Sequence, residues 1–331
     1  SIRNPYTRRV VGKVSCLERK DILRAIDVAK DYDFSIPAYR RSEILSTAAC
    51  HLKKQKKEFA QLITKEIGIC LKDSLHEVER AHHVVSLSAE EAKHIKGEVY
   101  AQEISGNTGH HLSIILREPV GLILCITPFN HPLNQVVHKV CPAIAANNSV
   151  ILKPSEKAPL TALKFAELML AAGLPHQMLQ VVTGHVNGIG PLLVQHPAID
   201  MISFTGSTRT GQWIMRRCGI KKLSLELGGN DAFVVMPDAD IPKAAEIAAR
   251  GAFGNSGQRC SSIKRIITFP DNAEAHYRIR TRKKYNKPKG FVLCRSTLES
   301  AFVRRIEQLA GVESWKYEPF QVFCTKENCS T

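Results

Sequence analysis

Short apolar segments alternate with amphipathic segments from Val120 to Phe269, and this alternation limits the possible fold more than any other feature of the sequence. The segments with the length and near-continuous apolar character of buried strands are Val120–Thr127, Ser149–Lys153, Met178–Thr183, Met201–Phe204, Leu223–Glu226, Ala232–Met236 and Ile263–Phe269. Helical spacing is found in Leu133–Ala146, Pro159–Ala172, Gly188–Gln195, Gly211–Arg217 and Ile241–Gly251. This pattern is typical of a parallel sheet covered by helices on both faces, so the sequence predicts an α/β fold.

The chain before Val120 has a different pattern. Residues 21–97 are predicted to be helical, and from Ser42 to Glu66 apolar residues recur close to every 3.6 positions. The basic residues that fall mostly on the polar side of this segment are Lys53, Lys54, Lys56 and Lys57. A solvated helix face explains them better than a nucleic-acid site.

A formal net charge of +15 over 331 residues suggests an acidic partner such as nucleic acid. Seven of the basic residues, however, lie within residues 278–289, a run with no acid and one aromatic residue. The run is too poor in apolar residues to be expected as a strand or a core helix, whereas residues 297–310 have the spacing of an amphipathic helix. A nucleic-acid-binding protein that uses this run is ranked last, and no membrane partner is expected.

The ten cysteines are scattered and contain no CxxC pair, so no metal site is predicted. Cys125 lies inside an apolar run and is expected to be a buried, reduced thiol, which favours a cytoplasmic protein. No stretch reaches the ~18 apolar residues of a membrane span. The polar first residues do not have the pattern of a signal peptide.

Cys260 is the first candidate for chemistry. It lies in Gly257-Gln-Arg-Cys260, a glycine-framed polar loop in which a thiol is better placed to react than inside a strand. The neighbouring Arg259 would help to stabilise a thiolate. An ordinary loop cysteine is the alternative.

Glu226 and Asn130 follow apolar strands, at the strand ends where ligands gather in parallel α/β sheets. Glu226, half-buried before Gly228 and Gly229, would have a raised pKa and serve as a general base. A carboxylate that caps a backbone turn is the alternative. Asn130 offers an amide donor to an oxyanion, although Asn-His-Pro is equally typical of a turn.

Two further strand ends carry residues suited to a nucleotide. Lys153 is suited to a phosphate or hydroxyl, and Glu156 to a ribose diol. Residues 204–211 (FTGSTRTG) have the pattern of a strand, a glycine loop and a helix start, where a pyrophosphate can bind. This segment is not GxGxxG and is a weak signal alone.

Six short motifs in a fixed order together resemble the aldehyde dehydrogenase superfamily: ITPFNHP, LKPSE, VVTG, FTGST, LELGGND and NSGQRC. The resemblance runs from about Asn4 to about Phe269. The residues around Asn130 and Cys260 are most similar to the branch that oxidises phosphonoacetaldehyde. Non-phosphorylating glyceraldehyde-3-phosphate dehydrogenases and lactaldehyde dehydrogenases are the neighbouring branches.

The resemblance implies a Rossmann-like parallel-sheet domain that binds NAD over residues 1–227 and an incomplete α/β catalytic domain that begins over residues 228–270. Residues 271–331 would be a divergent basic tail. Full-length relatives are longer and homo-oligomeric, and their Glu-x-Phe-Gly-Pro motif and oligomerisation strand are not recognisable in this sequence. A truncated or frameshifted product with weak or no turnover is therefore expected.

The resemblance also implies roles for the candidate residues. Cys260 would be the nucleophile that forms a thiohemiacetal and then a thioester, and Glu226 would activate the water that releases the acid. Asn130 and the Cys260 N–H would hold the oxyanion. The implied function is oxidation of an aldehyde to a carboxylic acid with NAD or NADP. An inactive remnant that only binds nucleotide is the alternative.

Lys153 and Glu156 match the positions that hold the adenosine ribose. Glu156 would repel a 2′-phosphate, which favours NAD over NADP. The other positions that match cofactor contacts are Thr127, Phe129, Ser155, Gly184, Gly206, Ser207, Gly211 and Leu227.

Three basic residues, Arg80, His131 and Arg259, form a hypothetical site for a phosphonate or phosphate on the substrate. In the alternative interpretation, Arg80 pairs with Glu77 or Glu79 on the surface and His131 only fills a turn.

Overall fold

The computed structural model describes residues 1–101, 112–269, 277–280, 291–294 and 322–324. The chain divides into two compact units, Ser1–Leu227 and Gly228–Thr331. Each unit has its own sheet and its own hydrophobic core.

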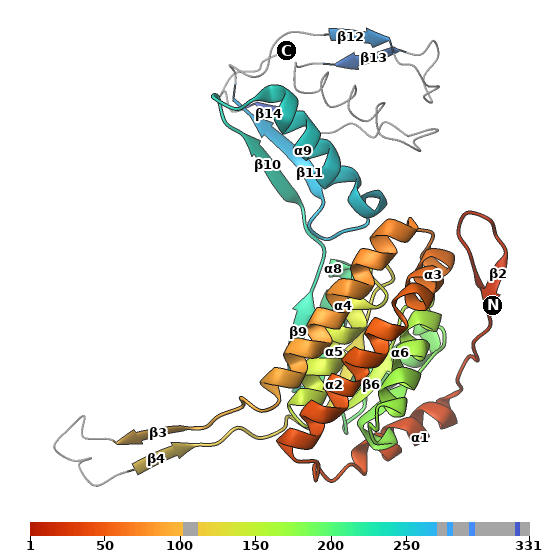
Figure 1. Ribbon diagram of the computed structural model, residues 1–331, viewed down its shortest axis with the longest axis vertical. Helices are drawn as coiled ribbons and strands as arrows, with labels where there is room; N and C mark the ends of the chain where they lie inside the picture. The colour runs from red at the N-terminus through yellow and green to blue at the C-terminus, as the bar shows by residue number, and fades with distance from the viewer. Residues whose placement is uncertain (102–111, 270–276, 281–290, 295–321, 325–331) are drawn as a thin grey trace. The chain divides into compact units, whose positions relative to one another are not determined.

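The first unit is built on a five-stranded parallel sheet in the order β7-β6-β5-β8-β9. Figure 1 labels β6 and the edge strand β9 of this sheet. Its strands are β5 (Leu122–Ile126), β6 (Ser149–Lys153), β7 (Leu179–Val181), β8 (Met201–Thr205) and β9 (Lys222–Glu226). The central strands β5 and β6 are buried along almost their whole length, as their apolar sequences require. The parallel sheet predicted from the sequence is therefore confirmed. At the edge, β9 alternates between exposed and half-buried residues.

Helices cover both faces of this sheet. Ile123 and Cys125 of β5 point into one core, whereas Leu122 and Leu124 point into the other, as the two-residue period of a strand dictates. The first core is shared with α2 (Ala38–Lys54), α3 (Lys56–Ile67), α4 (Leu71–Glu91), α5 (Asn134–Ala145) and α6 (Pro159–Ala171). The second is shared with α1 (Arg19–Lys30), α7 (Val186–Gln195) and α8 (Thr208–Met215). Burial raises the pKa of the Cys125 thiol to about 12, which confirms the expected inert buried cysteine.

The N-terminal region is helical but more interrupted than predicted. The segment from Ser42 to Glu66 is not one helix, because α2 and α3 meet at Gln55 and each packs against α4. The lysines around this junction are exposed or, in the case of Lys56, paired with Glu79 at 3.4 Å, which confirms the solvated face. Sequence reasoning missed two antiparallel pairs, β1 (Ile2–Arg3) with β2 (Val10–Gly12) and β3 (Glu98–Ala101) with β4 (Leu112–Ile115).

Buried carboxylates on the outer helices bind the first turns of the inner helices. Glu66 of α3 is 2% exposed and accepts the backbone N–H groups of Leu160 at 2.6 Å and Thr161 at 3.1 Å, together with the Thr161 hydroxyl. Both residues lie in the first turn of α6, where N–H groups have no partner within the helix. Glu66 therefore ties α3 to α6 by satisfying donors that the fold would otherwise bury without an acceptor.

The second unit contains the parallel order β10-β11-β14, with β10 (Asp231–Val235), β11 (Ile263–Thr268) and β14 (Val322–Cys324). Between β10 and β11 the chain forms α9 (Ile241–Phe253), whose side-chain cap is Asp240, and a 3-10 turn, η2 (Gly254–Gly257). The alanine-rich face of α9 packs against Val235 and Ile266.

The expectation for the basic run was wrong at its start. Residues 278–280 belong to β12 (Tyr277–Arg280), which pairs antiparallel with β13 (Phe291–Cys294). Backbone pairing does not require a wholly apolar strand, and Tyr277 and Ile279 alternate with arginines at a two-residue period. The remainder of the run and the amphipathic segment 297–310 lie outside the described residues. None of the helices in the described part of the chain has the length and apolar character needed to cross a bilayer.

Glu66 yields a prediction on stability. Burial raises the pKa of Glu66, and the hydrogen bonds from Thr161 and Leu160 oppose this rise. The folded state therefore holds the proton more tightly than the unfolded state, so this contribution to stability is present at low pH and is lost as pH rises through the raised pKa. We expect the difference in unfolding free energy, wild type minus Glu66→Gln, to decrease as pH increases from 4 to 7.

Urea denaturation of both proteins across this range measures the difference. Glu66→Ala, which leaves the α6 donors without an acceptor, should lose about 2–3 kcal/mol. Glu58→Gln is the matched control on the same helix, since Glu58 is exposed and forms a surface pair with Lys164. A pH-independent difference between wild type and Glu66→Gln would contradict the prediction.

Candidate functional site

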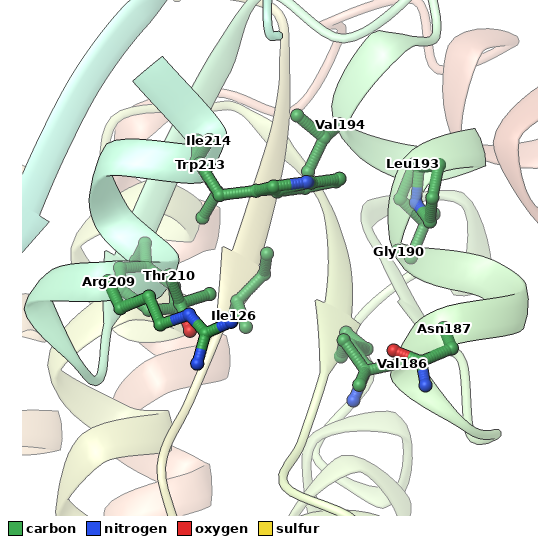
Figure 2. A pocket seen from close by; sticks show the side chains of 13 residues that line it. Ile126, Val186, Asn187, Gly190, Leu193, Val194, Arg209, Thr210, Trp213 and Ile214 are labelled. Carbon is green, nitrogen blue, oxygen red and sulfur yellow. The ribbon is translucent and has the colours of Figure 1, made fainter. Parts of the chain in front are cut away.

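A cavity of about 410 Å³ lies in the first unit between α7 and α8, at the carboxyl ends of β5, β6 and β8. Figure 2 shows Trp213 and Arg209 extending from α8 into the space opposite α7. The residues that line the cavity are Ile126, Lys153, Val186, Asn187, Gly190, Pro191, Leu193, Val194, Phe204, Arg209, Thr210, Trp213 and Ile214. Apolar walls with a few convergent cations suit a planar, largely apolar group that carries an anionic substituent.

Lys153 and Glu156 lie beside this cavity but are already engaged. Lys153 is 5% exposed, and its ammonium donates to the carbonyl of Pro154 at 3.1 Å. Burial lowers the pKa of Lys153, and Glu156 opposes this effect. Glu156 accepts from the N–H of Val186 at 2.5 Å and faces Nδ1 of His185 at 3.0 Å. Burial alone would raise the pKa of Glu156, but the N–H of Val186, His185 and Lys153 together lower it.

The FTGST segment turns from β8 into α8 as the sequence predicted. Ser207 is the side-chain cap of α8 and accepts the N–H of Thr210 at 3.2 Å. A Cβ at Gly206 would lie 2.5 Å from the Phe204 ring, and one at Gly211 would lie 2.5 Å from the Leu227 side chain. Both glycines therefore have a packing role within the protein. Gly184 lies between β7 and α7, and its missing Cβ faces Ile189 of α7.

The loop from β5 to α5 carries Thr127, Phe129 and Asn130. Thr127 is buried, and its N–H donates to the carbonyl of Lys153 at 3.2 Å, so the loop leaves the sheet beside the end of β6. The Lys157 ammonium lies 4.5 Å from the centre of the Phe129 ring. Ser155 accepts the Lys157 N–H at 3.3 Å, which fixes the neighbouring turn. Asn130 is half-buried in this loop.

His131 and Glu77 fix the end of the same loop. Glu77 of α4 is 3% exposed and accepts the N–H groups of Leu133 at 2.9 Å and Asn134 at 3.1 Å, where α5 begins. Its other oxygen lies 3.4 Å from Nδ1 of His131. Among the described residues, no ion pair joins Arg80 to Glu77 or Glu79, and Glu79 instead pairs with Lys56. Arg80 is exposed on α4 near His138, whose pKa is lowered by burial and then by Arg80.

Glu226 is the last residue of β9, so it lies at the carboxyl ends of the parallel strands, where the β5–α5 loop also begins. The expectation of a half-buried carboxylate was wrong, because Glu226 is exposed at the end of an edge strand. Sequence reasoning missed its neighbour Lys139, which is 9% exposed on α5 and donates to the Ser203 hydroxyl at 3.0 Å. Burial lowers the pKa of Lys139, and the nearby Cys125 and Glu226 oppose this effect. A lysine among the valines of α5 was the signal in the sequence.

Cys260 lies in the second unit, in an exposed loop between η2 and β11. Asn255, Ser256 and Gly257 before it have φ values of +56°, +56° and +72°, so three successive residues adopt the left-handed region. Two of them have a Cβ, and such conformations store strain that is typical of functional loops. The three candidate catalytic side chains are thus divided, with Asn130 and Glu226 in the first unit and Cys260 in the second.

The structure adds residues that the motifs did not indicate. Trp213 of α8 and Val186 and Leu193 of α7 line the cavity, although no motif pointed to them, and Arg209 lies in the FTGSTRTG segment but was not itself singled out. Their signal was only the helical spacing of apolar residues, which also occurs in ordinary cores. Within the described residues, no group of three or more His, Cys, Asp or Glu side chains is arranged to hold a metal ion.

Comparisons with known proteins agree on one family. A family model described as the aldehyde dehydrogenase family matches residues 1–284. The 3-sulfolactaldehyde dehydrogenase of Priestia megaterium is 42% identical over 266 residues, which cover 80% of this chain and 56% of the relative. The NADP-dependent glyceraldehyde-3-phosphate dehydrogenase of Nicotiana plumbaginifolia is 37% identical over 281 residues, with 83% and 56% covered. The chain thus spans little more than half the length of these curated relatives.

Solved structures show the same similarity. Glyceraldehyde-3-phosphate dehydrogenase from Methanocaldococcus jannaschii, solved with NADP, superposes with a TM-score of 0.77 at 35% identity and covers 81% of this chain and 59% of that one. Betaine aldehyde dehydrogenase from Staphylococcus aureus, solved with NAD+, superposes with a TM-score of 0.77 at 32% identity, with 81% and 54% covered.

The cavity between α7 and α8 yields a binding prediction. The sequence contains two tryptophans, Trp213 and Trp315, so Trp315→Phe leaves Trp213 as the single fluorophore. Because Trp213 lines the cavity, saturable binding of adenosine monophosphate should change its emission. The reciprocal variant, Trp213→Phe, should give no such change. An unaltered Trp213 signal, with nucleotide binding demonstrated by calorimetry, would place the nucleotide elsewhere.

Proposed function

We propose, for a chain that belongs to the aldehyde dehydrogenase family, that it carries out the NAD(P)-dependent oxidation of an aldehyde to a carboxylic acid. The observation that carries the proposal is the cavity at the carboxyl edge of the parallel sheet, with Asn130 and Glu226 at the same edge. Ligands in open α/β sheets bind at this edge. Because the chain spans about half of its relatives, the activity remains a proposal for these residues.

The residues around the cavity fit a dinucleotide. The apolar walls formed by Val186, Leu193 and Trp213 suit an adenine ring, and Lys153 and Arg209 offer cations beside it. Ser207 begins α8, whose first N–H groups are suited to a pyrophosphate. Thr127 and Phe129 would lie on the nicotinamide side, and the Leu227 carbonyl would face the carboxamide. The cofactor, when bound, supplies the hydride acceptor.

The chemistry of the proposal rests on Cys260, Asn130 and Glu226. The Cys260 thiolate adds to the aldehyde carbon, and the new oxyanion is held by the Asn130 amide and the Cys260 N–H. A thioester would remain on Cys260 after the thiohemiacetal carbon gives up a hydride, for which a bound cofactor would supply the acceptor. Glu226 takes a proton from water, which attacks the thioester carbon, releases the acid and restores the Cys260 thiolate.

An anionic aldehyde is the proposed substrate class. Arg80 on α4 and Arg259 beside Cys260 are the cations available to it. His131 lies next to Asn130, but its Nδ1 faces the buried Glu77. We therefore propose that His131 holds the loop rather than binding an anion. The names of the relatives include an aldehyde with a sulfonate group and one with a phosphate group, which supports this class without selecting between them.

Cofactor choice depends on two opposing groups in this proposal. A free carboxylate at Glu156 would disfavour a 2′-phosphate, but here it is bound by the Val186 N–H and faces His185. Arg209 lines the cavity and can pair with a 2′-phosphate. We therefore infer that the chain accepts NADP as well as NAD, rather than NAD alone.

The central prediction concerns Cys260. The purified chain, whose turnover is expected to be weak, should reduce NAD(P) only when an aldehyde is present, and Cys260→Ala should abolish this activity because no thioester can form. Cys50→Ala is the matched control, since Cys50 is also exposed but lies on α2. Glu226→Gln should accumulate an acyl adduct on Cys260, detected by peptide mass spectrometry. Nucleotide binding without aldehyde-dependent reduction would instead support the nucleotide-binding remnant.

A second prediction concerns Arg209. Arg209→Gln should raise KM for NADP by about 10-fold, because a charge-assisted hydrogen bond to phosphate is lost, and should leave KM for NAD within about 2-fold. Arg216→Gln, an exposed arginine just after α8, is the control. Equal changes in KM for both cofactors would contradict a role in recognising the 2′-phosphate.

A further inference from the structure

Lys264 occupies an irregular position in β11. Asp231 of β10 lies opposite Ile263, whereas the next residue, Ala232, lies opposite Arg265, so Lys264 is an extra residue in the register. Such bulges redirect a side chain and occur beside active sites. Here the bulge returns the Lys264 side chain towards the preceding loop, which carries Cys260.

The Lys264 ammonium lies among four oxygen acceptors. Its Nζ is 2.7 Å from the carbonyl oxygen of Cys260, 3.0 Å from that of Ser262 and 3.4 Å from that of Arg259. The fourth acceptor is a carboxylate oxygen of Asp231, at 3.3 Å. An ammonium has three N–H donors, so it satisfies the two short contacts fully and divides the third donor between the longer ones.

These carbonyls belong to the peptide groups that determine the geometry at Cys260. The Arg259 carbonyl and the Cys260 N–H are part of one planar peptide, and the Cys260 carbonyl is part of the next. Holding the two oxygens on one side therefore fixes the direction of the Cys260 N–H on the other side. A cation on the carbonyl also polarises the peptide, which strengthens its N–H as a donor.

Residues 228–231 (Gly-Gly-Asn-Asp) lie close to the Cys260 carbonyl. A Cβ at Gly229 would lie 2.7 Å from the Cys260 oxygen and 2.5 Å from the Asp231 carboxylate. Arg265 closes the arrangement, because its guanidinium donates to the Asn230 carbonyl at 3.1 Å and 2.8 Å. The segment 228–231 and the loop at 259–262 are thus held together by Lys264 and Arg265, both within the second unit.

The contacts of the Lys264 ammonium, called the clamp below, oppose backbone strain in the Cys260 loop. The chain enters the Cys260 loop through three left-handed residues, 255–257, and a loop entered in this way persists only where surrounding contacts determine it. The Ser262 hydroxyl donates to the Gly257 carbonyl at 3.1 Å, which adds one neutral contact between the two ends of the loop. The charged contacts come from Lys264.

We propose that Lys264 is a positioning residue that holds the Cys260 loop so that the Cys260 N–H points at the developing oxyanion. The proposal rests on the proposed function for its catalytic consequence, but the clamp itself is a property of the described loop. Lys264 touches neither substrate nor cofactor in this proposal and acts through the backbone of Cys260.

The test compares Lys264→Met, which keeps an unbranched side chain of similar shape but removes the ammonium, with Lys264→Arg and Asp231→Asn. Lys243→Met is the matched control, an exposed lysine of the same unit. Circular dichroism verifies the fold of each variant. Hydrogen exchange followed by mass spectrometry should show about 10-fold faster amide exchange over residues 259–262 in Lys264→Met, with α9 unchanged. Asp231→Asn should show a smaller effect, because the carbonyl contacts remain.

Steady-state kinetics of the same variants measure the consequence. Lys264→Met should lower kcat by about 10- to 100-fold with KM for aldehyde and cofactor within about 2-fold, and Lys264→Arg should restore part of kcat. Unchanged exchange over residues 259–262, or a loss expressed in KM alone, would overturn the proposal. If the wild-type chain does not oxidise aldehydes, the proposed function fails, and the exchange measurement still decides whether Lys264 holds the loop.

Discussion

The position of α5 depends on charged side chains buried at both of its ends. Glu77 accepts N–H groups where α5 begins. Arg41 of α2 donates to the carbonyl of Ala145, where α5 ends, and to that of Ile36, just before α2. An acid at the N-terminus and a base at the C-terminus are also the signs that the helix dipole favours. Since α5 continues directly from the loop that carries Asn130, the proposed oxyanion donor, this loop is held by the packing of α4 against α5.

This arrangement connects the core to the site. α2, α3 and α4 lie outside the sheet and contribute no cavity residue, yet Glu66 and Glu77 determine where the first turns of α6 and α5 lie. Each buried carboxylate accepts two backbone N–H groups and has one side-chain partner, the Thr161 hydroxyl for Glu66 and the His131 ring for Glu77, which offsets the cost of removing it from water. The outer helices are therefore part of the support of the site as well as of the core.

The sequence was sufficient to predict the sheet, because β5 and β6 are buried on both faces and read as continuous apolar runs. It was sufficient for the positions of Asn130, Glu226 and Cys260, because motifs mark strand ends and loops. It was not sufficient for Lys139, Lys264 or Glu77, since their partners are backbone groups or residues distant in sequence. The exposure of Glu226 was missed for a related reason. Periodicity identifies a strand but does not show that the strand lies at the edge of the sheet.

The hydrogen bonds of individual basic side chains change what the net positive charge of the chain implies. Lys221 donates to the carbonyls of His196 and Ile199, both at 2.7 Å, and Arg265 donates to that of Asn230. Backbone carbonyls also accept from Arg41, Lys153 and Lys264. These cations thus bind carbonyls in loops or at the end of a helix. A carbonyl is neutral, so a cation that binds one still adds to the net charge, although its N–H groups donate within the protein. Part of the +15 is therefore directed to backbone carbonyls of the protein itself, and net charge alone overstates the attraction of an acidic partner.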